Sequence, residues 1–273
     1  MSNLRQGRIA KSFAAALLLV AGLGARASGD EYANIHSVAI TSTLGSGLLM
    51  KQDAEFGSKP EPDFILDMGL NLDGYIAGKL TEAVAGRFTA VEASLDPASL
   101  KDYEDNDVYR QKVRDAFARN SGIATPDALI LIHPNTIVQQ TMIRALTFQY
   151  SGLSLNRTKG LFGKYSLLLS AQYAVSVIDT RTGREISSGT AGLPSTNIFG
   201  AHPDPILTCD EAFWPADPHN PSTGEKQQIQ ADVMALVAMS LPNAVQRINL
   251  SSSGNSARLN EWNGRVLMCR EFS

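Results

Sequence analysis

The sequence predicts an α/β fold of the α+β kind, a single domain in which helices pack on a mixed and mainly antiparallel sheet. The strongest observation is in residues 164–189, where apolar side chains recur at every second position up to a turn sequence. Residues 127–133 form an unbroken apolar run, which is typical of a strand covered on both faces. Apolar residues at helical spacing occur in three further stretches, 71–88, 107–119 and 227–248.

The first 27 residues have the features of a secretory signal peptide. Arg5, Arg8 and Lys11 precede an apolar run over residues 13–23, and residues 25–27 (Ala-Arg-Ala) provide the small residues that signal peptidase recognises. The run has about half the length of a spanning helix, and no cysteine stands near the cleavage site. We therefore expect an exported, periplasmic protein with no integral membrane segment after cleavage and no lipid anchor.

Signal cleavage would leave an acidic protein. The whole chain has 24 basic and 27 acidic side chains and a formal net charge of −3. Removal of residues 1–27 takes away four basic side chains and no acidic one, which changes the charge from −3 to −7. Because nucleic-acid binding requires a concentrated basic surface, no nucleic-acid partner is expected.

The chain then begins with a strand over residues 32–43, which contains Ile35, Val38 and Ile40. Residues 45–47 (Gly-Ser-Gly) follow it. The third glycine of the dinucleotide fingerprint is missing, and a charged, proline-containing loop over residues 51–63 stands where a helix should begin. We therefore interpret residues 45–47 as a flexible turn.

Two helices are predicted in the first half of the chain, separated by a short strand over residues 88–92. The apolar stripe of the first helix consists of Leu72, Ile76, Leu80, Ala83, Val84 and Phe88. The inward residues of the second helix are expected to be Val108, Val113, Ala116 and Phe117.

In the second half, the strand over residues 127–133 ends at Pro134, and residues 136–150 predict another strand before a loop over residues 151–163. In the hairpin of residues 164–189, one face is expected to be buried and the other to be mixed.

Residues 201–225 are rich in proline and acidic residues and predict an irregular loop. Pro242 should kink or divide the helix over residues 227–248. Residues 28–248 thus form the mixed α/β domain, and residues 249–273 form a polar linker and a C-terminal strand.

The only two cysteines, Cys209 and Cys269, predict one disulfide in an oxidising compartment. It would tie the C-terminal strand back to the loop over residues 201–225 and would stabilise the fold by roughly 4 kcal/mol on the chain-entropy model. The alternative is two unpaired buried thiols.

No catalytic signature is present. The chain has no Gly-x-Ser-x-Gly turn, and its four histidines never have the spacing that places two imidazoles on one helical face. His36 and His133 lie in predicted strands and are interpreted as structural residues. The sequence therefore favours a non-enzymatic protein without a cofactor, and an enzymatic activity stays the less favoured alternative.

The acidic loop contains the best candidates for a metal site, namely His202, Asp204, Asp210, Asp217 and His219. Their spacing is irregular, so we interpret these side chains as a solvated loop and keep metal binding as the alternative. Phe213 and Trp214 in the same loop are candidates for contact with a partner protein, because interfaces are enriched in aromatic residues. The alternative is that both side chains fill the edge of the core beside Cys209.

Three segments carry a resemblance to known families: residues 127–132, 167–183 and 231–245. In the order of its elements over residues 35–248, the chain resembles the mixed α/β periplasmic domain of the curli-secretion lipoproteins, of the lipoprotein activators of penicillin-binding proteins, and of the N-terminal part of the TolB family. Those lipoproteins carry an acylated cysteine where this chain has Ala27 and Ser28, and residues 151–163 are too short and polar for a pore-forming hairpin. The resemblance implies a soluble scaffold that presents a surface to an envelope machine and has no catalytic residues.

The expected function is therefore a periplasmic, non-enzymatic role through contacts with an envelope protein or cell-wall complex, in envelope assembly or maintenance. The alternative is binding of a small molecule or metal, including metal-dependent catalysis, by the loop over residues 202–219.

Overall fold

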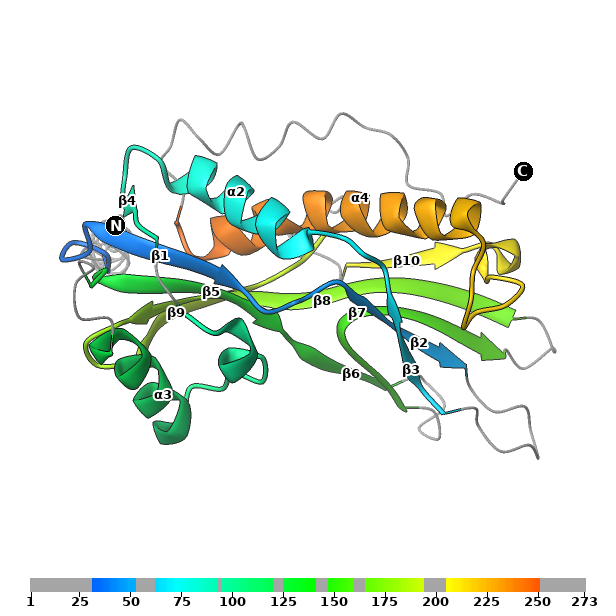
Figure 1. The fold of residues 1–273 in the computed structure, drawn as a ribbon, viewed down its shortest axis with the longest axis horizontal. Coiled ribbons are helices and arrows are strands. Elements are labelled where there is room, and N and C mark those ends of the chain that lie inside the picture. The colour runs from blue at the N-terminus through cyan, green and yellow to red at the C-terminus, as the bar shows by residue number, and fades with distance from the viewer. Residues whose placement is uncertain are drawn as a thin grey trace, which may run out of the picture. The chain divides into compact units, whose positions relative to one another are not determined.

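The computed structural model describes residues 31–52, 62–92, 95–119, 125–140, 147–159, 165–193 and 205–250, and residues from Ile35 onward form one compact unit. The strands are β1 Ser37–Ser42, β2 Gly47–Gln52, β3 Phe64–Asp67, β4 Thr89–Ala90, β5 Ala128–Pro134, β6 Thr136–Gln140, β7 Thr147–Lys159, β8 Tyr165–Asp179, β9 Glu185–Thr190 and β10 Ile206–Cys209 (Figure 1). The helices are α2 Leu72–Val84, α3 Asp107–Ala118 and α4 Thr223–Arg247, with short 3₁₀ helices η1 Pro97–Leu100 and η2 Glu211–Phe213. The expected signal peptide, residues 1–27, and the C-terminal segment beyond residue 250 lie outside the described residues.

The strands form one mixed sheet in the order β3-β2-β7-β8-β5-β1-β4, to which β9 and β10 add on β8 and β6 adds on β7. The pairs β1/β4, β1/β5 and β2/β7 are parallel, and the other six pairs are antiparallel. Figure 1 shows α2 and α4 on one side of the sheet and α3 on the other. The predicted fold class, helices on a mixed and mainly antiparallel sheet, is confirmed.

Strand β8 is the centre of this sheet, because it pairs with β5, β7, β9 and β10. Its predicted antiparallel return through a turn is confirmed, since β9 pairs back along it. The second face, predicted to be mixed, is exposed at Ser166 but is fully covered further along, where Gln172 and Ser176 are as buried as Tyr173 on the other face. The reason is that helices cover both faces of β8. On one face, the hydroxyl groups of Tyr173 and Ser240 of α4 form a hydrogen bond of 2.9 Å. On the opposite face, Ile178 packs in a cluster with residues of α3.

Helix α2 confirms five positions of the predicted stripe, which are all buried, and the sixth, Phe88, is also buried but follows the end of the helix. In α3, Val113 and Phe117 are buried as expected, but Val108 is 64% exposed. Val108 precedes Val113 by five residues, a rotation of about 140° around the helix, so the two side chains cannot face the same core.

Helix α4 is a single helix of 25 residues that contains Pro242. The alternative that Pro242 divides the helix is therefore wrong. The helix begins with a capping box, in which Ser222 and Glu225 bind each other's backbone N–H groups, and its buried stripe includes Leu236 and Val245. Packing of this stripe on β8 and β9 offsets the hydrogen bond that the proline cannot make.

Several strands were absent from the sequence interpretation. Strand β2 takes up residues 51–52 of the predicted loop over residues 51–63, and β3 begins directly after that loop. Strand β7 occupies most of the predicted loop over residues 151–163, and β10 lies in the expected irregular loop. The predicted strand over residues 136–150 is divided between β6 and β7. In β7, polar residues suggested a loop, yet Ser154 and Asn156 are buried because Ser154 Oγ lies 2.6 Å from Ser170 Oγ and accepts from Asn156 Nδ2 at 2.9 Å.

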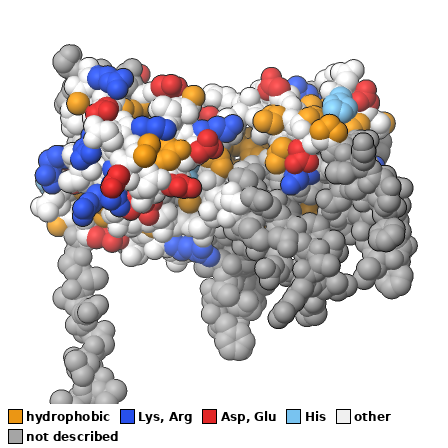
Figure 2. Space-filling model, turned by 90° about the horizontal axis from the view of Figure 1, so that it is seen from below, with side chains coloured by type: hydrophobic (Ala, Val, Ile, Leu, Met, Phe, Trp, Pro, Cys, Tyr) orange, Lys and Arg blue, Asp and Glu red, His pale blue; other side chains and the backbone are white. Residues whose placement is uncertain are grey.

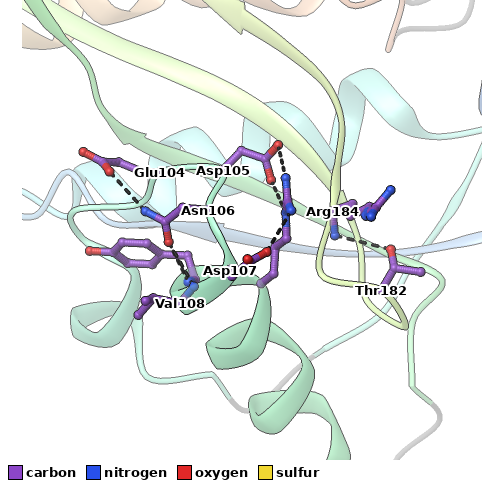
Figure 3. Close-up of polar contacts among 9 residues, drawn as sticks. Glu104, Asp105, Asn106, Asp107, Val108, Thr182 and Arg184 are labelled. Atoms are coloured by element: carbon purple, nitrogen blue, oxygen red, sulfur yellow. Dashed lines mark hydrogen bonds and ion pairs between the residues drawn. The ribbon is translucent and has the colours of Figure 1, made fainter.

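The start of α3 is fixed by local polar contacts (Figure 3). Asn106 caps the helix by accepting from the N–H groups of Val108 and Tyr109, and Arg110 donates to Asp105 and Asp107. These contacts fix the first turn of α3, and Figure 3 shows the turn between β8 and β9, with Thr182 and Arg184, beside it.

Candidate functional site

A groove of about 600 Å³ opens at the end of the sheet where the parallel strands β2 and β7 finish. We name it the Arg157 groove. It is lined by Gln52, Pro62, Arg157, Glu211, Trp214, Pro215, Ala216, Pro218 and His219. Gln52 and Arg157 are register partners at the carboxyl ends of the two strands, a place where α/β sheets commonly bind ligands. The volume is within the range of ordinary ligand pockets.

Arg157 is the side chain around which the groove is arranged. Its guanidinium lies 4.0 Å from the centre of the Tyr165 ring and 5.8 Å from that of Trp214, and Nη2 donates to Glu211 Oε1 at 2.9 Å. Tyr165 is within reach because it is the diagonal neighbour of Arg157 across β7 and β8. The buried Nε makes no hydrogen bond, so stacking and one ion pair hold the side chain.

Trp214 enters the groove because of the short helix η2. Asp210 caps this helix by accepting from the N–H of Ala212 at 3.3 Å, and the turn points Phe213 and Trp214 in different directions. Phe213 is fully buried, which makes it a core residue and removes it as a surface contact for a partner. Trp214 is half-buried and remains available at the groove.

The loop that forms the rim of the groove is fastened to the start of α4. Glu225 accepts from the N–H of Ala216 at 3.1 Å and from the N–H of Ser222 at 2.7 Å. These hydrogen bonds, together with the Ser222 side chain, lower the pKa of the Glu225 carboxyl, so it stays ionised at neutral pH. A groove with a fixed rim loses less conformational entropy when it binds a partner.

His219 closes the other side of the groove by stacking on Phe64, with ring centres 3.9 Å apart. Asp217 accepts from the N–H groups of His219 and Asn220 and thereby forms the preceding turn.

The visible face in Figure 2 carries basic, acidic and hydrophobic side chains in small groups. Recognition on that face would therefore depend on local groups rather than on one broad field of charge.

The metal candidates do not converge in the part of the chain that the structure describes. His202 and Asp204 lie outside it, Asp210 and Asp217 bind backbone N–H groups, and His219 stacks on a ring. No three His, Cys, Asp or Glu side chains among residues 31–52, 62–92, 95–119, 125–140, 147–159, 165–193 and 205–250 form a cluster that could hold a metal ion.

The predicted disulfide stays a prediction, because Cys269 lies outside the described residues. Cys209 ends β10 and is 7% exposed. His133 is a satisfied structural histidine as interpreted: Nε2 lies 3.0 Å from Ser176 Oγ and Nδ1 lies 3.2 Å from the carbonyl oxygen of Pro134.

Sequence reasoning did not find Arg157. Its strand was interpreted as a loop, so a single arginine within it had no predicted face or neighbours. The alternation of Leu153, Leu155 and Arg157 is the signal that could have placed it on one side of a strand.

The Arg157 groove is suited to binding. Its lining offers one cationic side chain, an indole, an imidazole and three prolines. Among the residues that the structure describes, the lining includes no serine or cysteine that a neighbouring base could activate as a nucleophile. Among the described helices, none is long and apolar enough to cross a bilayer.

Comparisons with known proteins give few matches. No protein-family model matches the chain, and no curated protein sequence matches it at a significant level. A solved structure of the lipoprotein GNA1162 from Neisseria meningitidis is 11% identical, with a TM-score of 0.26, over 74% of this chain and 98% of its own. The hypothetical protein CT253 from Chlamydia trachomatis is 9% identical, with a TM-score of 0.25, over 74% of this chain and 95% of its own. At these TM-scores the matches carry no argument about function, and the families named from the sequence remain a prediction.

Proposed function

We propose that the protein is an exported, non-enzymatic envelope protein that binds a partner protein in the Arg157 groove. The observation that carries this proposal is the arrangement of Arg157 between Tyr165 and Trp214, with Glu211 fixing the guanidinium at the groove wall. The periplasmic location rests on the basic and apolar N-terminal sequence.

The composition of the groove supports a protein partner. Tryptophan and arginine are the residues most often found at interface positions with large binding energies. Here both side chains already contact each other, and Glu225 fastens the rim. A partner would therefore meet a surface that requires little reorganisation, and most of its contact energy would contribute to affinity.

The test is site-specific crosslinking followed by purified binding. A photocrosslinking residue at Gln52 should capture one envelope protein, whereas the same residue at the exposed Val108 of α3 should not. The captured protein is then purified, and its affinity is measured for wild type, Trp214→Ala and Arg157→Lys. Both variants should bind at least roughly tenfold more weakly, because lysine cannot stack and donate as arginine does. Equal affinity for all three proteins would refute the groove as the binding site.

A small anionic ligand is the second candidate, and the volume of the groove together with the cation in it favours this. Calorimetric titration with short dicarboxylates distinguishes the two. Saturable binding of a dicarboxylate that Arg157→Lys weakens would support the ligand. If no dicarboxylate gives a heat of binding while crosslinking at Gln52 still captures a protein, the small ligand is excluded.

A further inference from the structure

Strand β3 has an outer edge on which none of the described strands pairs. It is the last strand in the order of the sheet, and among the strands that the structure describes it pairs with β2 alone. An unpaired edge presents a row of backbone donors and acceptors that another extended chain can use.

The register identifies which groups are open. The N–H of Met68 donates to the carbonyl of Ser46 at 3.0 Å, and residues of an antiparallel pair alternate between facing the neighbour and facing away. Leu66, two residues earlier and opposite Leu48, therefore faces β2. The backbone groups of Ile65 and Asp67 point away from β2, toward the open edge.

The side chains beside this edge form an acidic and apolar pattern. Asp63, Ile65 and Asp67 share one face of β3, since they occupy alternate positions. Ile65 is 66% exposed, which makes it one of the two large exposed apolar side chains of the described chain. Asp67 accepts from the N–H of Gly69 and the hydroxyl of Ser46, and these bonds lower the pKa of its carboxyl, so it stays ionised at neutral pH.

Ile65 also lines a second hollow, of about 540 Å³, between β3 and η1. Pro97 and Ala98 of η1 and Leu49 of β2 contribute apolar walls to it. An apolar side chain placed opposite Ile65 on an added strand would have this hollow beside it. The other end of β3 leads to the Arg157 groove, because Pro62 lines that groove and Phe64 stacks on His219.

The charges argue against a second copy of this chain as the occupant. Antiparallel self-pairing centred on Ile65 would place Asp63 of each copy opposite Asp67 of the other. Like charges directly opposite each other on a sheet are destabilising, whereas opposite charges there are stabilising. Lys51 offsets part of the charge of Asp63, at 3.5 Å, and the charge of Lys226 acts on Asp67 and helps to lower its pKa, so the repulsion between copies is reduced but both carboxylates stay ionised.

We propose that an extended segment of a partner protein adds as a strand to the outer edge of β3, with an apolar side chain opposite Ile65 and a lysine or arginine two positions away on each side of it. This inference rests on the proposed function and specifies how the partner of the Arg157 groove approaches. Backbone hydrogen bonds to Ile65 and Asp67 supply the pairing, and the alternation of basic and apolar side chains supplies the selectivity.

The test uses the full mature chain and a short fluorescent peptide with the central sequence Lys-Thr-Ile-Thr-Lys, followed by fluorescence anisotropy. The peptide should bind saturably. A peptide methylated on the backbone nitrogen of its isoleucine, and a peptide with glutamate in place of both lysines, should each bind at least roughly tenfold more weakly. Equal binding of the methylated peptide would overturn strand addition, since methylation removes the backbone donor and puts a methyl group where the hydrogen bond to β3 would form.

Protein variants give the matching test. Ile65→Pro removes the outward N–H without affecting the pairing with β2, and edge strands tolerate proline at such positions. It should abolish peptide binding, Ile65→Thr should weaken it, and the exposed control Val108→Thr should leave it unchanged. If Ile65→Pro and Ile65→Thr both bind the peptide as wild type does, the proposal is overturned. It is also overturned if Ile65→Pro changes the self-association of the protein but not its binding of the peptide.

The peptide-binding tests of the β3 edge can fail independently of the crosslinking and affinity tests of the Arg157 groove. Trp214→Ala should bind the peptide normally, because it lies outside the β3 edge. Loss of crosslinking at Gln52 with intact peptide binding would refute the proposed groove and leave strand addition standing, whereas the reverse result would refute strand addition alone.

Discussion

Gly183, in the turn between β8 and β9, lies directly against the backbone of Arg110 in α3. A Cβ atom at position 183 would overlap the carbonyl oxygen of Arg110, and Gly183 has a φ of +69°. The absence of a side chain at this position allows the turn to approach α3 so closely. Figure 3 shows Thr182 and Arg184 of this turn near the first turn of α3.

We expect Gly183→Ala to lower the free energy of unfolding by about 3 kcal/mol, from the positive φ and from the displaced helix. The matched control is Gly78→Ala on α2, where nothing lies within 4 Å of the added atom. Since that position is helical, the control should stabilise the protein by roughly 0.5–1 kcal/mol. Urea denaturation measures both changes, and equal effects of the two substitutions would contradict the close contact.

His133 should make stability fall as the pH is lowered. Burial lowers the pKa of this histidine below 6.5, because a charged imidazole beside Ser176 would lose its hydration. Below about pH 6.5 the unfolded state therefore binds more protons than the folded state, and the free energy of unfolding decreases. Denaturation at a series of pH values should show a smaller decrease in His133→Gln.

Glu185 serves as the internal comparison for this pH series. Burial raises the pKa of the Glu185 carboxyl above 4.5, so the folded state binds more protons than the unfolded state between 4.5 and the raised value. Its contribution is present at low pH and is lost as the pH rises through that window, which is the opposite sign to that of His133. Glu185→Gln should therefore steepen the loss of stability on acidification, and an unchanged profile would be evidence against the buried carboxyl.

Substitution of Phe213 should mainly lower the stability of the fold, whereas substitution of Trp214 should mainly weaken partner binding. Phe213→Ala removes a fully buried ring and is expected to cost about 3–5 kcal/mol of unfolding free energy. Trp214→Ala removes a half-buried ring at the groove and should cost roughly 1 kcal/mol while weakening partner binding. Thermal or chemical denaturation beside the binding assay separates the two effects. A large stability loss in Trp214→Ala would assign it to the core.

The disulfide between Cys209 and Cys269 remains a prediction that peptide mapping can decide. Proteolysis of the exported protein without reductant should release one crosslinked peptide that contains both cysteines. Addition of reductant should lower the unfolding free energy by roughly 4 kcal/mol. The double variant Cys209→Ser and Cys269→Ser should be insensitive to reductant, and free reaction of both thiols with an alkylating reagent under native conditions would contradict the pairing.

Periodicity predicted the elements whose side chains are apolar. The stripe of α2 and the apolar run of β5 needed only the spacing of their residues, because burial of such surfaces is favourable with any suitable neighbour. Strand β7 was missed for the opposite reason. Its buried Ser154 bonds to Ser170 on the neighbouring strand β8 and accepts from Asn156, and the spacing of residues within β7 does not show that β8 would supply such a partner.

By itself, the sequence determined the mixed α/β class, the helices, the central hairpin and an N-terminal segment with the features of an export signal. Only the tertiary structure decided that Phe213 is core while Trp214 faces a groove, that Arg157 stacks beside it, and that β3 has an open edge. The physical reason is that hydrophobic periodicity is a local property of the chain. A groove or an edge depends on which strands become neighbours, and pairings between distant residues fix that.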